Sequence, residues 1–177
     1  MKKYSLFLGL LFGVLLVNAQ NGELKVGDKA TDWKFTDAEN VEHSMETWKG
    51  KVLQINYVDP DESDLNDPYN DAIDKAVDID KIIPKEKFKG FGVVDCESTW
   101  KPNSLIRLIA GNKAEKYNTT ILFDYEAVLQ NQWGLPSDSY SVVIVDKNRI
   151  VRALYKGKIP DSEIPKIIKL IIELTKE

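Results

Sequence analysis

The sequence predicts an α/β fold, in which a central mixed sheet is flanked by helices. Residues 51–58 carry closely spaced apolar side chains and lead through an acidic turn to a helix start at Asp67 and Pro68. Near the end of the chain, the apolar runs 142–145 and 150–155 flank a short polar turn, which indicates a β-hairpin. At 177 residues, 43% of them hydrophobic, the chain is long enough for one domain with a sizeable core.

Apolar spacing and turn residues predict the other elements. Residues 32–36 and 41–44 are expected to form a β-hairpin ahead of the central strand. In the following helix, the side chain of Asp67 is expected to accept hydrogen bonds from the first free backbone N–H groups. Further along, the pattern predicts a strand at 91–95, a helix after Pro102, a strand at 119–123, a segment at 129–133 and a final amphipathic helix from 161. In the helix after Pro102, four apolar side chains are expected to lie near one face: Leu105, Leu108, Ile109 and Tyr117.

The first residues have the features of a secretory signal peptide. Two lysines precede an apolar run over 6–17, and Ala19 ends a small-residue cleavage site. The alternative is an N-terminal membrane anchor, but spanning a bilayer takes about 20 apolar residues and this run has about a dozen. We therefore expect a signal peptide at 1–19, a single mature domain at 20–177 without a transmembrane segment, and a periplasmic or secreted location.

The charge of the chain disfavours a nucleic-acid partner. Its 24 Lys and Arg residues are outnumbered by 28 Asp and Glu residues, for a formal net charge of −4 at pH 7. Cleavage of the signal peptide removes two of the lysines and makes the mature chain more acidic. Contacts to phosphate supply most of the affinity of nucleic-acid binding proteins, and the chain has no basic cluster to make them.

Cys96 is the only cysteine and His43 the only histidine. A single cysteine allows neither an internal disulfide nor a two-cysteine redox cycle. Cys96 is expected to be a small buried residue at the end of a strand; the alternative is a free thiol that pairs with a partner, although Asp95 and Glu97 beside it would raise its pKa. His43 alone cannot build a zinc or copper site and is interpreted as an ordinary strand residue.

The acidic loop at residues 59–67 is the strongest charge feature. Its carboxylates are the ligand type that Ca²⁺ prefers, but an EF-hand that starts at Asp59 would need a glycine where Asp64 stands and an acid where Asn70 stands. A solvated loop ahead of a helix is the preferred interpretation. We therefore assign no catalytic, cofactor or metal residue. The tryptophans are expected to be core or edge residues: Trp33, Trp48, Trp100 and Trp133.

The order of these elements resembles that of a thioredoxin-like domain with an N-terminal β-hairpin extension. The motif KVLQ at 51–54 and the ending VVIVDKNRIVRALYKGKIPDSEI at 142–164 more narrowly resemble the YtfJ-like family of exported bacterial proteins, a group of unassigned activity. Redox-active thioredoxins carry a Cys-x-x-Cys pair after the first central strand, where this chain has residues 61–64 and no sulfur. Their usual cis-proline would fall near Tyr140, and Pro136 lies earlier. The resemblance therefore implies the fold without the activity.

Three functions are compatible with this resemblance. The first is a redox-inactive binding or scaffold module for an unknown protein or peptide. The second is a thiol or peroxide oxidoreductase that acts through Cys96 and a thiol of its partner. The third is a regulator, a label sometimes attached to such families, which the acidic charge and the signal peptide oppose.

The candidate partner-binding surface combines two loops that meet at one edge of the sheet in this fold. One loop would supply acidic side chains and the other apolar contacts, a combination suited to a basic or mixed peptide. The residues assigned to it are Asp61, Glu62 and Asp64 on the acidic side and Trp133, Leu135, Pro136 and Tyr140 on the apolar side.

Overall fold

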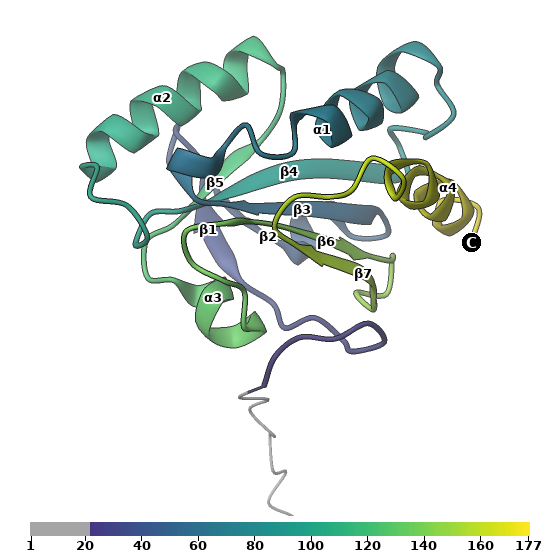
Figure 1. The fold of residues 1–177 in the computed structure, drawn as a ribbon, viewed down its shortest axis with the longest axis horizontal. Helices are drawn as coiled ribbons and strands as arrows, with labels where there is room; N and C mark the ends of the chain where they lie inside the picture. Colours follow the sequence, from purple (N-terminus) through teal and green to yellow (C-terminus); the bar gives the residue numbers. More distant parts are fainter. Residues whose placement is uncertain (1–21) are drawn as a thin grey trace, which may run out of the picture.

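The computed structural model describes residues 22–177, so the predicted signal peptide at 1–19 lies outside the described residues. Seven strands form one sheet in the order β2-β1-β5-β4-β3-β6-β7 (Figure 1). The strands are β1 (Lys34–Thr36), β2 (Glu42–Ser44), β3 (Val52–Val58), β4 (Phe88–Asp95), β5 (Ile121–Asp124), β6 (Tyr140–Val145) and β7 (Val151–Lys156). The helices are α1 (Asp67–Asp74), α2 (Asn103–Lys116), α3 (Val128–Trp133) and α4 (Ile164–Leu174). The predicted α/β class and the N-terminal hairpin of β1 and β2 are confirmed.

The sheet is covered on both faces. Helices α1, α2 and α4 lie on one face, and α3 lies on the other together with the N-terminal segment (Figure 1). Successive side chains of a strand point to opposite faces. Leu53 and Ile55 of β3 therefore pack with Leu129 of α3, whereas Val52 packs in the core that contains Ile73 of α1. Burial on both faces explains why five of the seven residues of β3 are apolar.

Strand β3 is parallel to β4, and β4 is parallel to β5. The pairing of β3 with β4 begins at Val52 and Phe88, so β4 starts earlier than the predicted residue 91. Lys89 and Gly90 interrupt the apolar pattern there, but hydrogen bonding to β3 keeps them in the strand. The carboxyl ends of the three parallel strands consequently meet at one edge of the sheet.

Helix α1 begins differently from the prediction. Asp67 is its first residue, and Asn66 before it makes no side-chain hydrogen bond to the helix. Asn66 instead donates to the carbonyl oxygen of Gly157 at 3.1 Å and accepts from the backbone N–H of Ile159 at 2.8 Å. The capping role expected for Asp67 was wrong, because the residue at the cap position is buried and holds the loop after β7.

Helix α2 forms where it was predicted, but its apolar side chains are arranged on two sides. Ile106 and Ala110 are buried and pack near Phe123 of β5. The residues that the sequence placed near one face are exposed instead: Leu105, Leu108, Ile109 and Tyr117. Their exposure gives α2 an uncovered apolar side.

A buried arginine connects the β6–β7 hairpin to the start of the central strand. The guanidinium of Arg149 donates to the carbonyl oxygens of Met45 at 2.5 Å, Trp48 at 2.9 Å and Lys51 at 2.9 Å. Burial lowers the pKa of Arg149, since desolvation disfavours its charged form. Hydrogen bonds to three carbonyl oxygens compensate for this desolvation and hold the segment before β3 in place.

Candidate functional site

Each of the three parallel strands ends in a buried aspartate. Asp59 directly follows β3, Asp95 ends β4 and Asp124 ends β5, and all three are at most 3% exposed. Asp95 and Asp124 are direct neighbours in the β4–β5 pairing. In α/β sheets, ligands bind beyond the carboxyl ends of the parallel strands, so this edge is the first place to look for a site.

Hydrogen bonds to the backbone occupy these carboxylates. Asp59 accepts from the N–H of Asp61 at 2.6 Å, and Asp124 accepts from the N–H groups of Val128 and Leu129, both at 2.9 Å. Asp124 thereby holds the start of α3. Burial raises the pKa of Asp59 and of Asp124, although the bonds to backbone N–H groups oppose the rise. We interpret both side chains as anchors of the turns that leave the sheet.

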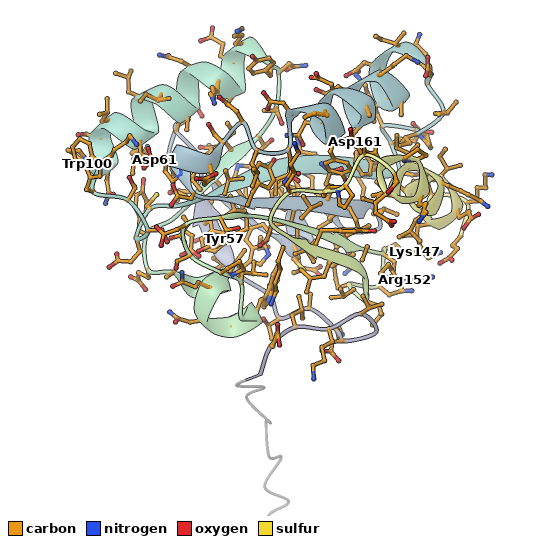
Figure 2. The ribbon with its side chains drawn as sticks, in the orientation of Figure 1. Tyr57, Asp61, Trp100, Lys147, Arg152 and Asp161 are labelled. Carbon is orange, nitrogen blue, oxygen red and sulfur yellow. The ribbon has the colours of Figure 1, made fainter. Side chains whose placement is uncertain are left out.

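Tyr57 lies in the interior near the same edge (Figure 2). Its hydroxyl group is buried and makes no hydrogen bond of ordinary geometry within residues 22–177, although Asp95 lies close enough to act on its pKa. Burial and the negative charges of Asp124 and Asp95 raise the pKa of Tyr57. A phenol in this environment stays protonated at neutral pH and does not serve as a general base.

Cys96 follows β4 and is buried, as predicted. Its Sγ lies 3.6 Å from the carbonyl oxygen of Val94. Burial, followed by the charges of Asp124 and Asp95, raises the pKa of the thiol to about 12. The sequence predicted that both Asp95 and Glu97 would raise this pKa. Asp95 does contribute to the rise, whereas Glu97 is not among its causes. A thiol with this pKa is almost entirely protonated near neutral pH and is a poor nucleophile.

The acidic loop faces α2 and the segment before it. Asp61 forms an ion pair with Lys101 and accepts a hydrogen bond from the hydroxyl of Thr99 at 3.1 Å. The hydrogen bond from Lys101 lowers the pKa of Asp61. Farther along α2, Lys113 lies 3.6 Å from Asp64. Asp61, Glu62 and Asp64 are all exposed, so their carboxylates are accessible from solvent.

The predicted apolar wall opposite this loop does not exist as an accessible surface. The two loops do touch, because the N–H of Asp59 donates to the carbonyl oxygen of Ser139 at 2.9 Å. Trp133, however, is 0% exposed and Tyr140 is 3% exposed. The two side chains belong to cores on opposite faces of the sheet. This part of the prediction was wrong, because it placed both on one wall.

The other residues predicted for this apolar surface do not form an accessible one either. Leu135 is buried in the same core as Trp133. Pro136 is half-buried. The hydroxyl of Tyr140 accepts a hydrogen bond from the side-chain amide of Asn70 at 3.0 Å, which holds the ring toward α1.

Trp100 was expected to be a core or edge residue, and this prediction was wrong. It is 86% exposed and lies at the same end of α2 as Asp61 (Figure 2). The ammonium group of Lys101 is 5.9 Å from the centre of its ring. The one available signal was its position in a polar, proline-containing turn, Thr99-Trp100-Lys101-Pro102, where a core residue has little to pack against.

Within residues 22–177, no group of three or more His, Cys, Asp or Glu side chains is arranged to hold a metal ion. No helix in this part of the chain combines the length and the apolar composition needed to cross a bilayer.

Several solved structures have a similar fold. The thioredoxin domain of a thiol-disulfide oxidoreductase from Bacteroides vulgatus has a TM-score of 0.62 at 14% identity, over 84% of this chain and 99% of that one. An exposed lipoprotein thioredoxin from Streptococcus pneumoniae has a TM-score of 0.60 at 14% identity, over 79% and 99%. A thiol peroxidase from Chromobacterium violaceum has a TM-score of 0.61 at 16% identity, over 86% and 89%. These likenesses define the class: this is a thioredoxin-like α/β protein that has a single cysteine.

Residues 14–174 match the family of bacterial proteins of unknown function designated YtfJ_HI0045. The chain belongs to this family, as its motifs indicated. It is also similar to an uncharacterized protein of Haemophilus influenzae, with 33% identity over 64 residues. That match spans 36% of this chain and only 35% of the length of the relative.

Proposed function

We propose that this protein is an exported binding module that uses the thioredoxin fold without thiol chemistry. The observation that carries the proposal is the exposed acidic loop, which stands where redox-active members of the fold have their thiol pair. It presents Asp61, Glu62 and Asp64 to solvent at the carboxyl edge of the sheet. The burial and the raised pKa of Cys96 support the same proposal, because they disfavour an oxidoreductase that works through this thiol.

The partner that best suits this loop is a protein segment with basic side chains. Glu62 forms no ion pair within the described part of the chain, and the Asp64 side chain is 81% exposed beside Lys113. Exposed ion pairs contribute about 0–1 kcal/mol, so a lysine or arginine of a partner can replace the internal one at little cost. Charge complementarity of this kind speeds association and makes it sensitive to salt.

In-cell crosslinking with a loop variant and a matched control variant tests the proposal. The loop variant carries Asp61→Asn, Glu62→Gln and Asp64→Asn. The control variant removes the same amount of charge from exposed positions on and after α1: Asp71→Asn, Asp74→Asn and Glu86→Gln. We expect the wild type and the control to capture the same partners, and the loop variant to lose most of the yield.

The salt dependence of capture provides the second readout. Raising the ionic strength should weaken capture by the wild type and the control, because salt screens exposed charges. If the loop variant folds normally and captures the same partners with the same yield and salt dependence, the acidic loop is not the binding site. Export has its own test: mass spectrometry of the mature protein should find Gln20 at its N-terminus, and a chain that retains residues 1–19 contradicts export with cleavage.

A further inference from the structure

A positive charge of the chain itself lies between the acidic loop and the turn before α2. The ammonium group of Lys101 forms an ion pair with Asp61 and lies 5.9 Å from the centre of the Trp100 ring. Within about 6 Å, the face of an aromatic ring attracts a cation. One carboxylate and one indole ring therefore hold the same charge. Both can be reached from solvent, because Trp100 is 86% exposed and the Asp61 side chain is 52% exposed.

The turn that carries Trp100 is fixed to the acidic loop. The hydroxyl of Thr99 donates to the carboxylate of Asp61 at 3.1 Å and accepts from the backbone N–H of Lys101 at 3.4 Å. Pro102 follows directly and restricts the backbone at the entry to α2. These contacts keep the indole ring near Asp61 at the carboxyl edge of the sheet (Figure 2). The exposure of the ring means that it contributes little to packing within residues 22–177.

This environment suits a guanidinium group better than the ammonium group that now occupies it. An ammonium group is a compact charge, whereas a guanidinium group is planar, stacks on an aromatic face and donates two parallel hydrogen bonds to a carboxylate. Each oxygen of Asp61 accepts one hydrogen bond in this structure, Oδ1 from Lys101 and Oδ2 from Thr99. Each oxygen can accept two, so the carboxylate has room for a second donor on each side.

We propose that an arginine of the partner displaces Lys101, stacks on Trp100 and pairs with Asp61. This inference rests on the proposed binding function and specifies the partner of the same loop as an arginine-containing segment. A lysine of the partner competes poorly, because it only exchanges one ammonium group for another, and Lys101 is tethered beside the site at a high effective concentration. An arginine adds stacking and a second hydrogen bond, so the site prefers arginine to lysine.

The affinities of two labelled peptides test this preference. One peptide alternates arginine with glycine, the other has lysine in place of every arginine, and fluorescence anisotropy gives the dissociation constant of each. The wild type should bind the arginine peptide about fivefold more tightly, as expected from stacking on an exposed ring. Trp100→Ala should remove the preference, and Trp100→Phe should retain part of it. Tyr117→Ala is the matched control, because Tyr117 is exposed at the other end of α2, and it should leave the preference unchanged.

Removal of the internal lysine tests the displacement. Lys101→Met leaves the carboxylate and the ring without their internal cation, so it should lower the dissociation constant of the arginine peptide about two- to fivefold. Lys116→Met is the matched control. It removes the same charge from the last residue of α2, about 20 Å along the helix, and should leave the dissociation constant nearly unchanged.

Several results would overturn the proposal. They are equal binding of the two peptides by the wild type, binding of neither, a preference that survives Trp100→Ala, or a Lys101→Met protein that binds no more tightly than the wild type. In-cell crosslinking with Trp100→Ala separates this inference from the proposed function. If capture depends on the acidic loop but not on Trp100, the binding function stands and the arginine site is wrong. If capture does not depend on the loop, the binding function itself fails.

Discussion

The reactivity of Cys96 gives the sharpest quantitative prediction. Burial and two neighbouring carboxylates raise its pKa from the ordinary value of 9.0 to about 12. Near pH 8 this change lowers the thiolate fraction about 1,000-fold, and the thiolate is the reactive form. The folded protein should therefore react with a chromogenic disulfide reagent at least about 1,000-fold more slowly than the same chain unfolded in urea, since burial also restricts access to the sulfur.

The assay is the change in absorbance under a large excess of reagent, followed from pH 7 to pH 10. A Cys96→Ser protein that carries Ser137→Cys is the control, because Ser137 is exposed and its replacement should react at the ordinary rate. If folded Cys96 reacts within about tenfold of the unfolded chain, the thiol is accessible and ionised, and the reasoning from burial and charge fails.

Three further predictions concern stability, measured by urea unfolding. As the pH rises from 9 to about 12, the free energy of unfolding of the wild type should fall by up to about 4 kcal/mol relative to that of Cys96→Ala. The reason is that the unfolded chain releases the thiol proton in this range and the folded chain retains it. Equal pH profiles of the two proteins would contradict this. Arg149→Met should lower the free energy of unfolding by about 3 kcal/mol, because it removes three hydrogen bonds to carbonyl oxygens at a buried site. Lys34→Met, which breaks an ion pair with Glu42 that is exposed on both sides, should lower it by at most about 1 kcal/mol; equal costs would refute the role of Arg149. Tyr57→Phe should be neutral or stabilising, because its buried hydroxyl makes no hydrogen bond of ordinary geometry within residues 22–177. Tyr69→Phe should lower the free energy of unfolding by about 1–2 kcal/mol, because it leaves Gln54 without its 2.8 Å hydrogen bond; the opposite order would be evidence against the hydrogen-bond assignments.

The strands and the last helix could be predicted from sequence because their patterns are local. Strand β3 has closely spaced apolar residues at five of its seven positions, and the β6–β7 hairpin has a polar turn between two apolar runs. In α4, Ile167, Ile171 and Leu174 repeat at helical spacing and are all buried. Where burial follows from a repeat within one element, the neighbouring residues carry enough information.

The candidate site could be predicted only in part, because burial there depends on residues far apart in the chain. Trp133 and Tyr140 are close in sequence, but one belongs to α3 and the other to β6, whose side chains enter cores on opposite faces. The partner of Asp61 is Lys101, on the loop before α2, and sequence spacing does not indicate this pairing. A helix such as α2, apolar on two sides, also gives no periodic signal for which side is inside.

The reduction of insulin disulfides by dithiothreitol shows whether this thioredoxin-like protein acts without thiol chemistry. The assay compares the wild type with Cys96→Ser, which has no sulfur left for exchange, and follows the turbidity of the released insulin chains. Both proteins should give the rate of dithiothreitol alone. Turnover by the wild type above that of Cys96→Ser would contradict it, because Cys96 would then act as a catalytic thiol.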